Sequence, residues 1–295
     1  MEISVIGGDL RLIRLVQMYG KENNKIYTYG LEKYFKDEEN KIDNNIIMCQ
    51  NMEEIISLSK YIISSIPLSK DNIYINSPYS NEKIEINNLR NKMLELLCSE
   101  DMESKYFIAG KIPKDFYNEK IKCIDLLENE EFNILNSIPT VEGTIKIVLE
   151  EREETIHESN VLICGFGRIG KILCDRFKSM GAHVFCTARK ESDLAWIREE
   201  GYIPLEYSEI KGYGGIFDVL INTVPSLVID KEKIDSFDKN ILLIDLASNP
   251  GGIDKEYALE NEIKAITALG IPGKEMPSAA ARYIKEVTEK IVKKN

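Results

Sequence analysis

Residues 160–170 read NVLICGFGRIG and decide the fold, because an apolar strand runs directly into the pattern G-x-G-x-x-G. A helix is predicted over Lys171–Met180, and Ala182–Thr187 is typical of a second strand. In such a unit the first glycine allows a tight turn, the second admits a pyrophosphate and the third lets the helix pack closely. The stretch predicts a Rossmann-type unit that binds a dinucleotide at the helix N-terminus. The alternative is the same fold with a vestigial site.

The end of the second strand indicates which dinucleotide is bound. It reads TARK over residues 187–190, with no acidic residue before Glu191. NAD sites usually place a carboxylate there for the ribose hydroxyls. Without that carboxylate, Arg189 would bind a 2′-phosphate, and Thr187 and Lys190 would donate further hydrogen bonds to it. We therefore expect NADP(H) in preference to NAD(H), although a solvated basic turn would look the same. The contacts predicted at the glycine turn are Gly165, Gly167, Arg168, Ile169 and Gly170.

Two later strands end in polar turns, DVLINTVPS over residues 218–226 and ILLIDLASNPGG over 241–252. Ligands of open α/β sheets lie outside the carboxyl ends of the strands, so both turns should border the nicotinamide end of the site. The alternative is that their proline and glycine residues only make turns. The cofactor contacts predicted here are Asn222, Thr223, Val224, Pro225, Asp245 and Ala247.

The 295 residues predict two domains, both α/β, each a Rossmann-like, doubly wound parallel sheet, set around a cleft. Residues 1–136 would form an N-terminal substrate domain; that the helix at 277–295 packs back on it is implied by the family resemblance given below. Residues 137–154 would be an interdomain helix and 155–276 the dinucleotide-binding domain. The remaining strands are expected at 3–6, 25–29, 46–48, 61–65, 73–75, 106–109, 121–124, 202–205, 219–222, 241–245 and 264–268.

Composition excludes several classes of function. A net charge of −11 and a pI near 5.0 argue against a nucleic-acid partner and a polybasic membrane anchor. No apolar run approaches the roughly 20 residues of a membrane helix, and the N-terminus lacks a signal-peptide pattern. We therefore expect a soluble, cytoplasmic protein. The six cysteines are scattered and only two histidines exist, so no metal site is expected. Neither His157 nor His183 is placed to act as a catalytic base.

Several strings resemble one family. They are NSIPTVEGT at 136–144, IGGD-x-R at 6–11, DLASNPGG at 245–252 and G-x-P-G at 270–273. With the glycine turn and residues 222–226, these strings are similar, in order along nearly the whole chain, to the dipicolinate synthase A-chain family of spore-forming bacteria. The resemblance implies oxidation of dihydrodipicolinate to dipicolinic acid during sporulation, in the mother cell. It also implies the flavoprotein-like second subunit of dipicolinate synthase as partner, a domain arrangement like that of D-2-hydroxyacid dehydrogenases, and a homo-oligomer as an option.

The implied substrate is a dianion whose oxidation makes an aromatic ring, so a histidine base is dispensable. We expect Ser137 and Thr140 to bind its carboxylates, at the N-terminus of the interdomain helix. Arg11 and Ser248 are supporting candidates, and Glu142 is a candidate proton acceptor. One alternative is another NAD(P)-dependent 2-hydroxyacid or amino-acid dehydrogenase, although residues 223–226 and 248–252 lack the base and the arginine clamp it would need. A non-catalytic NADPH-binding subunit is the second alternative.

Overall fold

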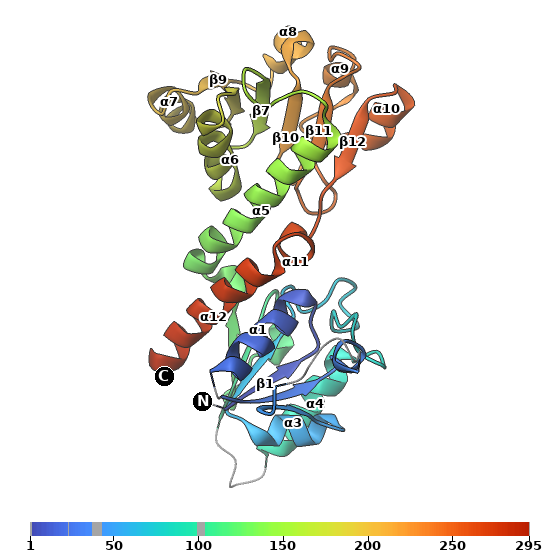
Figure 1. Cartoon of the computed structure of the whole chain (residues 1–295), viewed down its shortest axis with the longest axis vertical. Coiled ribbons are helices and arrows are strands. Elements are labelled where there is room, and N and C mark those ends of the chain that lie inside the picture. The colour runs from blue at the N-terminus through green and yellow to red at the C-terminus, as the bar shows by residue number, and fades with distance from the viewer. Residues whose placement is uncertain (1, 23, 37–42, 99–103, 295) are drawn as a thin grey trace. The chain divides into compact units, whose positions relative to one another are not determined.

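A computed structural model describes residues 2–22, 24–36, 43–98 and 104–294 (Figure 1). The chain divides into two compact units. Unit 1 comprises Met1–Asn136 and Pro272–Asn295, and unit 2 comprises Ser137–Ile271. Each unit is built around its own six-stranded sheet, in which all the paired strands are parallel.

The sheet of unit 1 has the strand order β3-β2-β1-β4-β5-β6. Its strands are β1 (Glu2–Ile6), β2 (Lys25–Tyr29), β3 (Ile46–Met48), β4 (Tyr61–Ser64), β5 (Lys105–Ala109) and β6 (Ile121–Asp125). The helices are α1 (Leu10–Lys21), α2 (Glu32–Phe35), α3 (Met52–Leu58), α4 (Ile86–Leu97), α12 (Pro277–Lys294) and the 3-10 turns η1 (Lys114–Phe116) and η2 (Leu126–Glu128). Helix α11 (Ile271–Lys274) begins at the last residue of unit 2.

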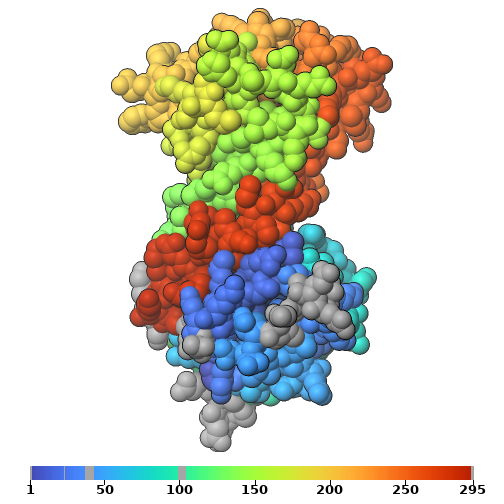
Figure 2. All heavy atoms as spheres, viewed as in Figure 1, coloured from blue at the N-terminus to red at the C-terminus, as the bar shows by residue number. Residues whose placement is uncertain are grey.

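Helices cover both faces of this sheet, which explains why its strands are continuous apolar runs. One face packs on α1 and α12, and Ile13 and Ile284 are fully buried there. The other face packs on α3 and α4, through residues such as Ile55 and Leu89. Helix α12 lies against α1 although the two are far apart in sequence, as the red and blue segments in Figures 1 and 2 show. The C-terminal helix therefore completes the core of the N-terminal unit.

Unit 2 repeats the plan with the order β12-β11-β10-β7-β8-β9. Its strands are β7 (Asn160–Cys164), β8 (His183–Thr187), β9 (Ile203–Leu205), β10 (Val219–Asn222), β11 (Leu242–Asp245) and β12 (Lys264–Thr267). Its helices are α6 (Arg168–Ser179), α7 (Glu191–Glu199), α8 (Ile210–Tyr213), the 3-10 turn η3 (Gly214–Ile216), α9 (Lys231–Ile234) and α10 (Lys255–Glu260). Alternate residues of β7 enter opposite cores: Val161 and Ile163 face α6, whereas Leu162 faces α9 and α10.

Each sheet has a point at which the strand order reverses. It lies between β1 and β4 in unit 1 and between β7 and β10 in unit 2. The connections leaving such a pair diverge to opposite faces of the sheet, which leaves a crevice at the carboxyl ends of the strands. The topology therefore gives each unit one natural ligand position.

The predicted fold class is confirmed, and so are most of the strands. Residues 73–75 do not form a strand. They take part only in isolated antiparallel bridges, Ser69 with Ile75 and Tyr74 with Glu85. This short apolar run is enclosed in a loop that Asp71 folds locally, through hydrogen bonds from the amides of Ile73 and Tyr74. Within the described chain, no helix is both long enough and apolar enough to span a membrane.

The predicted start of the interdomain helix is wrong. Helix α5 runs over Glu130–Glu151 and holds Pro139 in its interior. The side chain of Asn129 accepts from Phe132 N at 2.9 Å, which caps the helix ten residues before Pro139. The prediction placed the start at the proline because proline favours the first turn of a helix. Ser137 and Thr140 consequently lie inside the helix, where backbone amides donate to carbonyls four residues earlier and cannot bind an anion.

The core assignment predicts that two identical substitutions have different costs. Ile221 in β10 is fully buried, whereas Ile216 in η3 is 46% exposed. Ile221→Ala should lower the free energy of unfolding by about 2–5 kcal/mol, because it leaves a cavity in the core of unit 2. Ile216→Ala should cost less than about 1 kcal/mol. Urea unfolding followed by circular dichroism measures both, and equal losses would contradict the assignment.

Candidate functional site

The turn between β7 and α6 is held by close packing that only glycine permits. Gly165 has φ +99°, and its amide donates to the Thr187 carbonyl at 3.1 Å. A Cβ atom at Gly165 would lie 2.7 Å from Thr223 Oγ1, and one at Gly170 would overlap the carbonyl oxygen of Gly165. The backbone of helix α6 therefore packs directly against the backbone of the turn.

Gly167 differs, because the space that its Cβ would occupy has no neighbour within 4 Å. It is the N-cap residue of α6 and supplies no capping side chain. The first-turn amides of a helix have no intrahelical acceptor, and the helix dipole makes this end partially positive. The N-terminus of α6 is thus an anion-binding position with open space before it.

A pocket of about 330 Å³ lies at this turn, at the point where the strand order of unit 2 reverses. It draws residues from the loops that follow β7, β8, β9 and β10. The residues that line it are Gly165, Phe166, Gly167, Ala188, Arg189, Lys190, Asp193, Tyr207, Thr223, Val224 and Pro225. Seven of the predicted cofactor residues are therefore brought together: Gly165, Gly167, Arg189, Lys190, Thr223, Val224 and Pro225.

Three charged residues are among those that line this pocket. Arg189 and Lys190 are exposed there, and Asp193 in the first turn of α7 stands beside them. Tyr207 forms part of the wall; burial raises its pKa, against the opposing effects of the Thr187 hydroxyl and Arg189. Sequence reasoning missed Asp193 and Tyr207. The acid three residues beyond Lys190 was a usable signal, whereas nothing local to Tyr207 indicated its position.

Thr187 does not have the role expected from the sequence. Its side chain is fully buried, and its hydroxyl oxygen accepts from Gly165 N at 3.3 Å. A buried hydroxyl beneath the turn cannot reach a phosphate in the pocket. Thr187 instead fixes the turn from below.

Asn222 and Asp245, at the ends of β10 and β11, form a buried pair that we call the loop clamp. Asn222 Nδ2 donates to Asp245 Oδ1 at 2.8 Å and to the Val224 carbonyl at 3.0 Å. The Asn222 side-chain oxygen accepts from Val224 N at 3.1 Å. The amides of Ala247 and Gly252 donate to Asp245 at 3.1 and 2.8 Å. The clamp therefore joins both polar turns.

The loop clamp corrects two predicted cofactor contacts. The polar atoms of Asn222 and Asp245 are already bonded to the protein, and both side chains are buried. They position Val224 at the pocket instead of touching a ligand themselves. Ala247 is also buried and serves as a donor to Asp245. Ser248 is exposed beyond the clamp, so its hydroxyl remains open to solvent.

The side chain of Arg11, in the first turn of α1, is partnered within unit 1. Its Nε donates to Asp9 Oδ1 at 2.9 Å, and its Nη2 donates to Asp9 Oδ2 at 2.7 Å and to the Ile66 carbonyl. Asp9 also caps α1 by accepting from Arg11 N. The guanidinium charge is therefore balanced locally, which weakens the expectation that it holds a substrate carboxylate.

The other substrate candidates lie on α5 and not on the pocket wall. Ser137 is 5% exposed, Thr140 is half-buried and Glu142 is exposed. The Thr140 carbonyl accepts from the Thr144 hydroxyl at 2.8 Å. The backbone argument for anion binding fails here, and only the side chains of these three residues remain as candidates.

Two doubly wound sheets, one with a glycine turn beside a pocket at the strand-order reversal, define a Rossmann-like dehydrogenase fold. Consistent with it, the chain is similar to the D-isomer specific 2-hydroxyacid dehydrogenase of Lactobacillus delbrueckii ssp. bulgaricus, in its NAD-complexed form. The TM-score is 0.53 at 11% identity, over 99% of this chain and 98% of that chain. The Rossmann-like fold predicted from the sequence is thereby confirmed.

Closer similarity identifies the family. Residues 2–127 match the model of the N-terminal domain of the dipicolinate synthase A chain. The chain is 31% identical to the dipicolinate synthase A chain of Bacillus subtilis (strain 168), over 99% of this chain and 96% of that protein. The crystal structure of the A chain from Bacillus subtilis superposes with a TM-score of 0.83 at 29% identity, over 100% of this chain and 96% of that chain. The protein belongs to the dipicolinate synthase A-chain family.

The loop clamp yields a stability prediction. Asp245→Asn places an amide group against backbone donors and should lower the free energy of unfolding of unit 2 by about 2–4 kcal/mol. Asp238→Asn is the matched control, because this exposed carboxylate accepts only from Asn240 N among the described residues. The control should cost less than about 1 kcal/mol. Chemical denaturation of both variants makes the comparison, and a neutral Asp245→Asn would show that the clamp does not hold the loops.

Proposed function

We propose that this chain is an oxidoreductase that prefers NADP(H) to NAD(H) and oxidises dihydrodipicolinate to dipicolinic acid. The observation that carries the proposal is the open, uncapped N-terminus of α6 at Gly167, beside the basic pair Arg189 and Lys190. Membership of the dipicolinate synthase A-chain family supports the choice of substrate.

The residues present fit a phosphorylated dinucleotide. Gly167 leaves room for a diphosphate, and the amides of Arg168, Ile169 and Gly170 in the first turn of α6 would bind it. Arg189 and Lys190 would hold the 2′-phosphate, because two cations outnumber the single carboxylate of Asp193. Residues 223–225, fixed by the loop clamp, would border the nicotinamide end.

Oxidation of a dihydropyridine dicarboxylate removes one hydride and one proton, and an aromatic pyridine remains. The nicotinamide, when bound, accepts the hydride. The proton needs only a weak acceptor because aromatisation drives the step, and we keep exposed Glu142 as the candidate. The hydroxyls of Ser137, Thr140 and Ser248 remain candidate donors to the substrate carboxylates, with Arg11 as a weaker one. Of these candidates, Arg11 belongs to unit 1, whereas Ser137, Thr140, Glu142 and Ser248 belong to unit 2, as do the residues proposed for the cofactor.

The same proposal includes the setting of the reaction. It assigns a flavoprotein-like second subunit of the synthase as partner, since the family is named as one chain of a larger enzyme. It places the reaction in the cytoplasm of the mother cell during sporulation. Self-association of the chain is compatible with it.

Cofactor preference depends on Arg189. Arg189→Glu should raise the Kd for NADPH at least about tenfold and change the Kd for NADH little, because the new carboxylate opposes a 2′-phosphate that NADH lacks. Arg198→Glu makes the same charge change on an exposed residue of α7 that does not line the pocket. Isothermal titration of both variants with each coenzyme gives the answer. Equal losses for NADPH and NADH would remove Arg189 from the phosphate site.

Catalysis is tested directly. Dihydrodipicolinate generated in situ should be converted to dipicolinate faster than its spontaneous oxidation when the protein and NADP⁺ are both present. Ultraviolet absorbance of the aromatic product follows the rate, with and without the flavoprotein-like partner. Product formation at the spontaneous rate under all conditions, with NADPH still binding, would instead make the chain a non-catalytic NADPH-binding protein.

A further inference from the structure

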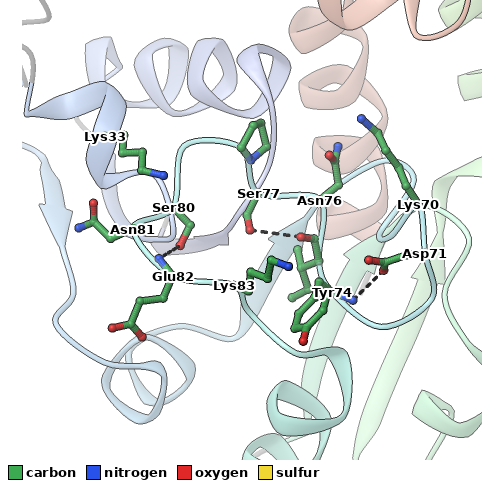
Figure 3. A pocket seen from close by; sticks show the side chains of 12 residues that line it. Lys33, Lys70, Asp71, Tyr74, Asn76, Ser77, Ser80, Asn81, Glu82 and Lys83 are labelled. Atoms are coloured by element: carbon green, nitrogen blue, oxygen red, sulfur yellow. Dashed lines mark hydrogen bonds between the residues drawn. The ribbon is translucent and has the colours of Figure 1, made fainter.

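Unit 1 has a pocket of its own, of about 390 Å³. The loop that follows β4 supplies eleven lining residues between Lys70 and Lys83, and Lys33 of α2 adds to them (Figure 3). The loop starts where the strand order of this sheet reverses, between β1 and β4. In open α/β sheets that is the place where ligands bind. The loop after β4, one of the two loops that border this reversal, therefore lines the unit 1 pocket.

Three lysines, Lys33, Lys70 and Lys83, line the unit 1 pocket although the chain carries 49 acidic and 38 basic residues. Among the described residues, Lys33 and Lys70 form neither an ion pair nor a side-chain hydrogen bond. Lys83 Nζ lies 4.8 Å from the centre of the Tyr74 ring. In the view of Figure 3, Lys33 and Lys70 stand on opposite sides of Lys83 and Ser77. These ammonium groups are available to an anionic ligand.

Two carboxylates also line the pocket, but one of them already accepts hydrogen bonds from its own loop. Asp71 Oδ1 accepts from Ile73 N and Tyr74 N, both at 2.9 Å, and from Ser69 Oγ at 3.0 Å. The hydrogen bond from Tyr74 N, more than any other contact, lowers the pKa of Asp71, so its charge serves the fold of the loop. Glu82 is exposed at the far end of the pocket. The cations outnumber the acids, three to two.

The loop is held in place by long-range hydrogen bonds and does not need a ligand to order it. The Asn76 carbonyl accepts from Gly8 N at 3.1 Å and from Ser65 Oγ at 2.7 Å, and Asn76 N donates to the Leu68 carbonyl at 2.8 Å. Ser77 and Ile75 pack on Gly7, where an added Cβ would lie within 3.1 Å of both. A preformed pocket loses little entropy when a small ligand binds.

We propose that the unit 1 pocket binds a small organic dicarboxylate, with Lys33, Lys70 and Lys83 sharing its two charges. The pocket volume of about 390 Å³ is within the range of pockets that bind small molecules. Tyr74, Ile75 and Pro78 give apolar parts of the lining for the carbon skeleton, and Asn76 and Ser77 supply polar groups. The choice of a pyridine dicarboxylate among such dianions rests on the proposed function.

The test is titration calorimetry of the full chain with pyridine-2,6-dicarboxylate. Lys33→Gln, Lys70→Gln and Lys83→Gln should each raise the Kd by roughly three- to tenfold, as expected for the loss of one partly screened charge contact. Lys36→Gln, at the C-cap of α2 and outside the pocket lining, is the matched control and should leave the Kd unchanged. Unchanged thermal melting and NADPH binding exclude misfolding.

Pyridine-2-carboxylate and inorganic phosphate are the comparison probes, and both should bind more weakly than the dicarboxylate. The proposal is overturned if the wild-type chain does not bind the dicarboxylate, if phosphate binds as tightly, or if Lys36→Gln weakens binding as much as the pocket variants. Turnover separates this proposal from the proposed function. Lysine-dependent binding without catalysis would contradict only the reaction, whereas catalysis without lysine-dependent binding of the dicarboxylate would contradict only the pocket.

Discussion

The close contact between α6 and the glycine turn is the constraint on which the site in unit 2 depends. Gly170 lies against the carbonyl of Gly165, and no other residue type leaves room for that approach. The contact sets the first turn of α6 directly beneath open space at Gly167. Because the helix has no capping side chain, its terminal amides and dipole remain to be satisfied by an anion. One packing contact thus fixes both the turn and the open helix N-terminus that we propose as the phosphate site.

The loop clamp performs the complementary task on the other side of the strand-order reversal. A buried carboxylate is costly unless several donors surround it. Asp245 obtains them from Asn222 and from the backbone of the following loop. Polar residues at strand ends can therefore serve a ligand without touching it, by fixing the loops that do. The same principle applies in unit 1. There the Ser65 hydroxyl donates to the Asn76 carbonyl and holds the lysine-lined loop in place.

Sequence patterns predicted the parts of the molecule that are determined locally. The alternation of apolar strands and helices, and the turn at Gly165–Gly170, both depend on neighbours in sequence. The start of α5 was missed because Pro139 favours a helix start locally, whereas the buried packing of Phe132 in unit 1 fixes the earlier turns. The roles of Asn222 and Thr187 were misjudged for a related reason. Whether a polar side chain faces a ligand or the protein depends on contacts from distant strands.

Unit 1 shows the limit of such reasoning most clearly. Lys33, Lys70 and Lys83 are unremarkable surface residues in the sequence. Lys70 and Lys83 line one pocket with Lys33 of α2 because Gly8 and Leu68 hydrogen-bond to the backbone of Asn76 and hold the long loop in place. No local sequence pattern predicts those hydrogen bonds.

The central claim is that the first turn of α6 receives the phosphates of a dinucleotide. Hydrogen–deuterium exchange of the backbone amides of residues 167–171, with and without NADPH, tests it most directly. The account predicts that NADPH slows exchange in this segment and leaves the amides of α12 unchanged. Exchange at residues 167–171 that is the same with saturating NADPH and without it would contradict the account.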